Sequence, residues 1–422
     1  MPEKSLIYAL PLLALATLGW GDSGPSNAAV NARTSSKPIQ RLALNQPRML
    51  GEPGCNATAF AQLPDDRSLF IGRQLVTADG RLAGVSGPND CSGGDPANEK
   101  RGQAFNRWSL TLTKLDWKSG QFSIVKALID TSTDPRTKRS RAIITGGPMR
   151  GLIIRSAYDP SVAKLGDKTY VAFECTVENG QRYHVQQTSS CVSSYDTKRQ
   201  SIDVQRTVVA VSGNQQGNIY HVAAVPRLLA FKGSLYLYWS AMTVKNGQIM
   251  SSVARGAELV DDANGIHLKR AGSRVPTAQD AASIAIWTPD RSAMGNRLVN
   301  IMSFAPGTSD FLILAALGGS TCNAPSDKSA GCFRLAVRRS STPLAHMGFN
   351  HAEVVDPGLP TNPQEYALPV QDPQGSTWLM GHFVRPPANG FADRRSLPDK
   401  NYWQKTSRAS ALLMVPAPGL QP

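Results

Sequence analysis

The chain has 422 residues, a formal net charge of +14 and only 18% charged residues, together with 36 glycines and 29 prolines. No stretch keeps a 3.6-residue apolar period over the length of a helix, so the sequence excludes a mainly helical fold. The length is enough to bury a large core, and the glycine and proline content is typical of short strands joined by turns.

The N-terminal segment has the pattern of an export signal. Lys4 precedes an apolar run over residues 6–18 that is too short to span a bilayer comfortably. A stretch rich in small residues follows, so we expect residues 1–32 to be a signal peptide or an uncleaved N-terminal anchor. Residues 33–54 are polar and are expected to form a disordered lead-in. These features predict a secreted or periplasmic protein with no other transmembrane segment.

A hairpin motif recurs along the rest of the chain. A proline, an apolar run, a glycine and an aromatic residue opening a second apolar run occur at residues 160–173, 226–239 and 369–380. Weaker copies at residues 63–71 and 283–299 bring the number to five. Hairpins repeated at this interval favour a β-propeller, although two sandwich sheets with similar hairpins are an alternative. The prediction is an all-β, five-bladed β-propeller that forms a single domain over residues 55–415.

The six cysteines are expected to form disulfides in an oxidising compartment. Pairing between sequence neighbours is the simplest arrangement, and it would join Cys55 to Cys91, Cys175 to Cys191, and Cys322 to Cys332. No Cys-x-x-Cys motif occurs and the six histidines are scattered, so the sequence indicates no metal site. No phosphate-binding glycine loop or other cofactor motif is present, and no cofactor is expected.

The net positive charge narrows the choice of partners. One basic cluster consists of Arg136, Lys138, Arg139 and Arg141. An exported basic protein is attracted to anionic polysaccharide, lipid headgroups or cell wall, although solvated loops are the simpler alternative. No nucleic-acid recognition motif occurs. The expected partner is a polysaccharide or oligosaccharide, with an anionic glycan among the candidates, and we expect a monomer.

In a propeller, the first strand of every blade brings its opening residues close to the central axis, so the residues around each motif's proline are candidate site residues. The polar candidates are Asp65, Asp66, Asp159, His221, Asp280 and Glu365. Carboxyl groups around one cavity are what glycoside hydrolysis requires, because one protonates the leaving oxygen and the other activates water or attacks the sugar. The candidates for substrate contacts by stacking or hydrogen bonding are Arg155, Tyr158, His221, Asp280, Trp287 and Tyr366.

Residues 158–171, which begin Tyr-Asp-Pro-Ser-Val, resemble the Asp-Pro-Ser-Val strand and hairpin of five-bladed propeller glycosidases, the arabinanase and xylosidase group with its fructosidase relatives. In that group an aspartate of this type activates water, or tunes the acid and orients the substrate. About one blade precedes Asp159, so the resemblance implies the tuning role for Asp159. The base would then be Asp65 or Asp66.

The same resemblance implies an acid glutamate two residues before the proline of a following blade, and this chain has Ala224 there. The candidate substitutes are Glu174, Glu353 and Glu365. Glu174 and its neighbouring cysteine resemble the Glu-Cys pair of the fructosidases, although a structural role at a strand end is an alternative. Glu365 begins a predicted first strand and is preferred, whereas Glu353 fits an exposed loop.

Three functional hypotheses follow from this pattern. The first is a glycoside hydrolase, and the second is a non-catalytic propeller of the cell envelope that binds a glycan or a partner protein. The third is a structural interaction protein that uses broad loops as contact surfaces. A fold of this kind does not fix the chemistry, so the arrangement of the carboxyl groups has to separate the three.

Overall fold

The computed structural model describes residues 48–49, 60–77, 79–82, 107–178, 188–203, 206–245, 248–287, 297–318, 333–345, 353–354, 363–384, 410–417 and 420. These residues form 23 strands and no helix, which confirms the all-β class. The described residues accordingly contain no helix long and apolar enough to cross a membrane. The predicted export signal lies outside the described residues.

The first two sheets are antiparallel and follow the chain in order. The first sheet contains β2 (Phe60–Leu63), β3 (Asp66–Val76), β4 (Arg107–Asp116) and β5 (Gln121–Ile129). The second sheet contains β6 (Ile153–Leu165), β7 (Lys168–Glu178), β8 (Thr188–Asp196), β10 (Val208–Val211) and, beside β8, β9 (Ser201–Ile202).

Three further antiparallel sheets complete the described chain. The third contains β11 (Asn214–Gln216), β12 (Ile219–Phe231), β13 (Ser234–Lys245), β14 (Gln248–Asp262), β15 (Gly265–Leu268) and β16 (Ile284–Trp287). The fourth contains β17 (Arg297–Pro306), β18 (Phe311–Gly318), β19 (Phe333–Ser340) and β20 (Glu353–Val354). The fifth contains β21 (Pro363–Gln371), β22 (Thr377–Val384), β23 (Ser410–Pro416) and β1 (Arg48–Met49).

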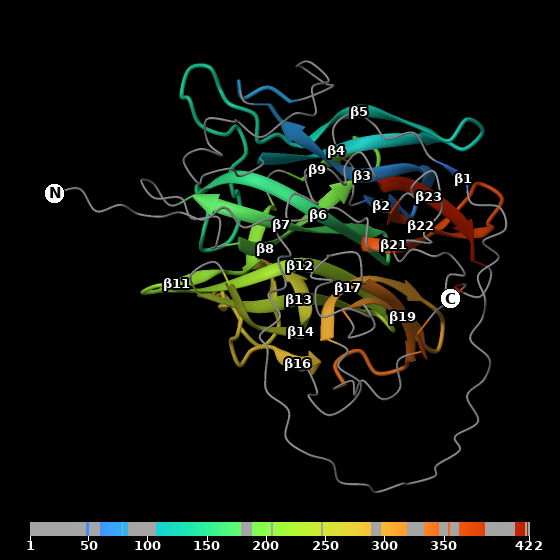
Figure 1. Ribbon diagram of the computed structural model, residues 1–422. Helices are drawn as coiled ribbons and strands as arrows, with labels where there is room; N and C mark the ends of the chain where they lie inside the picture. The colour runs from blue at the N-terminus through green and yellow to red at the C-terminus, as the bar shows by residue number, and fades with distance from the viewer. Residues whose placement is uncertain are drawn as a thin grey trace, which may run out of the picture.

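The sheets pack face to face in a β-propeller arrangement (Figure 1). Separate apolar clusters lie between the first and second sheets, the second and third, and the third and fourth. Another cluster joins Phe60 and Phe70 of the first sheet to Val370 and Met380 of the fifth. The fifth sheet also contains both the earliest described strand, β1, and the last, β23. The two ends of the described chain therefore meet in one sheet, and β1 lies within the segment expected to be a disordered lead-in.

One strand from each sheet borders the centre of the arrangement, and we call these five the first strands: β2, β6, β12, β17 and β21. They lie beside one another in this order, and β21 lies beside β2 (Figure 1). They belong to different sheets, so polar side chains rather than a backbone ladder connect them. The hydrogen bonds are Leu228 N to Ser161 Oγ (2.9 Å), Arg227 Nε to Met302 O (2.5 Å), Ser303 Oγ to Ala367 O (2.9 Å), and Gln62 Nε2 to Gln371 O (2.7 Å). These bridges satisfy backbone groups that would otherwise be buried without partners.

The predicted hairpins at residues 160–173 and 226–239 are present as β6–β7 and β12–β13. Their turns use Gly166 (φ 62°) and Gly233 (φ 79°), conformations that favour glycine. In β21–β22, the strands are joined by the longer turn at residues 372–376. Counting back from each turn, the register equivalent of Pro160 and Pro226 is Tyr366 rather than the predicted Pro369.

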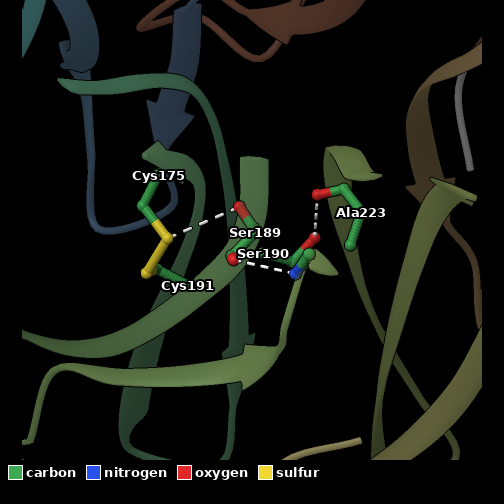
Figure 2. Close-up of a disulfide and its surroundings, with 6 residues drawn as sticks. Cys175, Ser189, Ser190, Cys191 and Ala223 are labelled. Carbon is green, nitrogen blue, oxygen red and sulfur yellow. Dashed lines mark hydrogen bonds between the residues drawn. A yellow bond between two sulfur atoms is a disulfide. The ribbon is translucent and has the colours of Figure 1, made fainter. Parts of the chain in front are cut away.

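The predicted pairing of Cys175 with Cys191 is confirmed, with a Cα–Cα distance of 5.8 Å. Figure 2 shows the disulfide joining the neighbouring strands β7 and β8, where both sulfur-bearing side chains are buried. Ser190 immediately precedes Cys191 on β8, and its hydroxyl donates to Ala223 O (3.0 Å) of the third sheet. The disulfide therefore stabilises a strand that contacts the neighbouring sheet. The cysteines of the other two predicted pairs lie outside the described residues.

Candidate functional site

The first strands of the second, third and fifth sheets each contain a two-residue bulge at the same distance from their turns. The bulged residues are Asp159 and Pro160 in β6, Val225 and Pro226 in β12, and residues 365–366 in β21. Asp159 and Val225 both have positive φ, at 52° and 53°. Such a conformation is unusual for a non-glycine residue and especially for a β-branched one, so the bulges are strained positions around the axis.

Asp159 is buried, with 2% of its surface exposed, and it has a cationic partner. Arg73 Nη1 of β3 lies 3.2 Å from Asp159 Oδ1, and the Arg73 guanidinium stacks 4.6 Å from the centre of the Trp108 ring. Arg227 Nη1 of β12 donates to Asp159 O (3.3 Å). Strands of three different sheets therefore hold this bulge in place, and a buried carboxylate requires such pairing.

Glu174 of β7 lies in register with Tyr158, which precedes Asp159. It is 1% exposed, and its Oε2 accepts a hydrogen bond from Val225 N (2.7 Å), the strained position of the next sheet. Burial, followed by the negative charge of Asp159, raises the pKa of Glu174 to about 8, although the Tyr158 hydroxyl, the Val225 amide and the Arg227 charge act in the opposite direction. Burial and the Asp159 charge therefore favour the protonated form of the Glu174 carboxyl group.

Tyr158 completes this buried group. Burial and the nearby Glu174 carboxyl raise the pKa of the Tyr158 hydroxyl well above its usual value. The Tyr158 hydroxyl and Glu174 Oε1 are both buried without a hydrogen bond of good geometry in the described part of the chain. A neutral acid with an unpartnered oxygen beside a paired carboxylate has the groups needed for proton transfer. Tyr158 is enclosed by protein, so it supports Glu174 rather than offering an open face for stacking.

Asp65 and Asp66 lie at the opposite end of the blades from this group. Asp65 is in the β2–β3 turn, where it pairs with Lys164 and accepts a hydrogen bond from Thr197 Oγ1 (3.2 Å). Asp66 opens β3, and seven residues along that strand separate it from Arg73, the partner of Asp159. At about 3.3 Å per residue, this separation is roughly 23 Å. The structure therefore does not bring either residue together with Asp159.

Arg155 and His221 occupy matching positions, each four residues before the bulge of its strand. Both are partly buried, and His221 Nδ1 lies 3.3 Å from Thr243 Oγ1. Asp280 lies outside the first strands, in a turn where Arg274 Nη2 is 2.7 Å from Asp280 Oδ1. The hydrogen bond from Arg274 lowers the pKa of Asp280 to about 2, so Asp280 is a carboxylate bound to a neighbouring arginine.

Only the backbone is described for four of the remaining candidates. Glu365 and Tyr366 are the bulged residues of β21, so Glu365 occupies the register position of Asp159. Trp287 ends β16, an outer strand of the third sheet, and Glu353 begins β20 at the edge of the fourth. Glu365 is therefore the candidate that the fold aligns with Asp159.

A cavity of about 380 Å³ lies between the five first strands, on the turn side of the bulges. Most of its lining is apolar, and its charged lining residues are Arg67, Lys164 and Arg227. No carboxyl side chain lines it, and no cluster of metal-ligating residues occurs in the ranges that the structure describes. Asp159 and Glu174 therefore lie beyond the Pro160 end of the cavity.

No protein family and no curated protein matches this sequence. Solved structures similar to this chain include a thermostable family-43 glycoside hydrolase, with 10% identity, a TM-score of 0.45, and coverage of 87% of this chain and 91% of that one. Another is the family-43 endo-arabinanase from Bacillus licheniformis, with 10% identity, a TM-score of 0.43, and coverage of 86% and 95%.

The GH43_1 enzyme from Xanthomonas citri in complex with xylotriose is similar over 88% of this chain and 89% of that one, with 11% identity and a TM-score of 0.44. The resemblance predicted from residues 158–171 is thus found again among solved structures of the arabinanase and xylosidase group. At these identities the activities of those enzymes are not carried over to this chain.

Proposed function

We propose that this protein is a single-domain, five-bladed β-propeller that acts on a polysaccharide outside the cytoplasm. Five sheets, five adjoining first strands and the apolar cluster between the first and fifth sheets support the blade number. The Cys175–Cys191 disulfide and the signal-like residues 1–32 support an oxidising, extracytoplasmic location. Chromatography of the secreted protein together with N-terminal sequencing tests the compartment, the cleavage site and the expected monomer.

The observation that carries the proposal is the buried pair formed by Asp159 and Glu174. Glu174 has a raised pKa because of its burial and is the proposed general acid, which protonates the leaving glycosidic oxygen. Asp159 is the proposed tuning residue, because its charge raises the pKa of Glu174. Glu365 is the proposed base that activates water, because it has the register position of Asp159 on another first strand. Arg155 and His221 would bind substrate hydroxyl or carboxylate groups.

The proposal is tested by incubating the full chain with a panel of arabinans, xylans, fructans and polyuronides and measuring new reducing ends. Asp159→Asn and Glu174→Gln should each lower turnover by about a hundredfold or more, the usual range for a general acid. Glu258→Gln is the matched control, since Glu258 pairs with Lys269 at a partly exposed site away from the first strands. Full turnover by Glu174→Gln would eliminate the assigned acid.

Two observations favour a second function, binding of a glycan without turnover. Asp159 and Glu174 are almost completely buried, and the described residues that line the cavity between the first strands include basic but no acidic side chains. This alternative expects saturable binding with no product from any member of the panel. It also expects Asp159→Asn to change stability more than affinity.

A further inference from the structure

The connection between the first and second sheets forms two consecutive hairpins. In the first, Thr133 pairs with Ser140, Arg141 N donates to Ser132 O (3.0 Å), and Lys138 N donates to Asp134 O (2.8 Å). In the second, Ile143 pairs with Ile153, and Gly151 N donates to Ile144 O (2.8 Å). These hydrogen bonds give residues 132–153 a defined backbone. We call this segment the double hairpin.

The double hairpin presents positive charge to solvent. Its exposed basic residues are Arg136, Lys138, Arg139, Arg141 and Arg150. Its single carboxylate, Asp134, accepts hydrogen bonds from Arg136 N (2.7 Å) and Thr137 N (3.3 Å). Those backbone hydrogen bonds lower the pKa of Asp134, so this carboxylate stays ionised while its oxygen is used within the loop. Arg141 Nε lies 4.0 Å from Asp130 Oδ2, whereas Arg136, Lys138 and Arg139 form no ion pair within the described part of the chain.

The double hairpin is attached to the strand that carries Asp159. Ser140 Oγ donates to Ile154 O (2.6 Å), and Ile154 N donates to Ala142 O (2.9 Å). Ile154 lies five residues before Asp159 on β6, which corresponds to about 16 Å of strand. The basic surface therefore lies at the end of β6 that leads to the Asp159 and Glu174 pair, whereas the turn end of β6 contains Lys164, which pairs with Asp65.

We propose that the double hairpin binds an anionic polysaccharide, such as a polymer of uronic acid or sulfated sugars, and that it holds the chain next to the first strands. This inference rests on the proposed function, and it adds that the polysaccharide is negatively charged. Exposed cations such as Arg136, Lys138 and Arg139 attract a polyanion, and this attraction weakens as salt increases. The double hairpin lies beside the N-terminal end of β6, which leads to the Asp159 and Glu174 pair. This position favours a polysaccharide chain that runs toward the pair as the ligand, rather than a membrane surface.

The test measures binding of the full chain to polygalacturonate and to neutral arabinan by isothermal titration calorimetry at low and high salt. The test variant is Arg136→Ser/Lys138→Asn/Arg139→Ser, in which asparagine suits the positive φ of residue 138. The matched control is Lys118→Ser/Lys198→Ser/Lys232→Asn, which removes the same charge from exposed turns at the other end of the blades.

The expected result is salt-sensitive binding of polygalacturonate by the wild type, about tenfold weaker in the test variant and nearly unchanged in the control. Three exposed ion pairs, each contributing a factor of roughly two, give this magnitude. Equal losses in the two variants, or equal affinity for neutral arabinan, would overturn the inference. Vesicles of anionic lipid are titrated in the same way, and binding to them without binding to polygalacturonate would also overturn the inference.

Product formation is measured separately with Asp159→Asn, so the two proposals can fail independently. Binding that depends on the double hairpin without any product supports the inference and rejects hydrolysis. Turnover of neutral glycans only, with no effect of the test variant on affinity, supports hydrolysis and rejects the inference.

Discussion

The protonation of Glu174 makes a prediction about stability that does not depend on substrate. In the unfolded chain the carboxyl group has a pKa near 4.5, whereas in the folded chain the pKa is about 8. The folded state therefore binds one more proton than the unfolded state between these values. The stabilisation from this group is complete below pH 4.5 and is lost as the pH rises to about 8.

The magnitude follows from the same shift. Each pH unit in this window lowers the free energy of unfolding by about 1.4 kcal/mol, so the loss is on the order of 3 kcal/mol at pH 7. Glu174→Gln removes this titration. Glutamine keeps a carbonyl oxygen that accepts the hydrogen bond from Val225 N, so the fold should be retained.

The assay is urea unfolding at pH 5, 6, 7 and 8 for the wild type, Glu174→Gln and the control Glu258→Gln. We expect the stability difference between Glu174→Gln and the wild type to grow in favour of glutamine at each step, and the control to follow the wild type. Parallel pH profiles for the wild type and Glu174→Gln would show that Glu174 is ionised in the folded protein. That result would also remove the proposed acid.

Three further predictions concern the support of this site. Arg73→Leu removes the cation that lies 3.2 Å from the buried Asp159 Oδ1 and should lower the free energy of unfolding by about 3–5 kcal/mol, measured by urea unfolding, with Arg73→Lys restoring part of the loss. Cys175→Ala/Cys191→Ala opens a loop with a sequence separation of 16 and should cost about 3 kcal/mol, measured by thermal unfolding against the oxidised wild type, whereas the reduced wild type should behave like the variant. Gln62→Ala leaves backbone groups of β21 without partners and should cost about 1–3 kcal/mol, while hydrogen exchange accelerates in β21 and not in β13.

The locally encoded parts of this structure could be predicted from the sequence. Gly166 and Gly233 occupy turns that need positive φ, and the apolar runs on either side give the hairpins their strands. The Cys175–Cys191 disulfide followed from sequence proximity, because the two residues lie on neighbouring strands of one hairpin. Asp159 was found because a proline marks its bulge.

Positions that depend on register could not be predicted in the same way. Pro64 belongs to a turn, whereas Pro160 belongs to a bulge, and a proline in sequence does not distinguish the two. Asp65 therefore lies after the end of β2, whereas Asp159 lies within β6. The long turn after β21 shifts Pro369 by three residues from the position of Pro160, because turn length is independent of the strand pattern.

The alanine at residue 224 illustrates a more general difficulty in judging a site from one expected position. By resemblance, the acid belongs to β12, yet β12 has Ala224 followed by the strained Val225. The carboxyl group of Glu174 on β7 reaches the backbone amide of Val225, so a buried acid lies next to the expected position although its residue belongs to another sheet. Adjacent blades pack face to face, and a side chain from either blade can therefore supply the same chemical group. The absence of a glutamate from β12 therefore does not show that the site lacks an acid. The catalytic chemistry depends on which carboxyl groups the packed blades bring together.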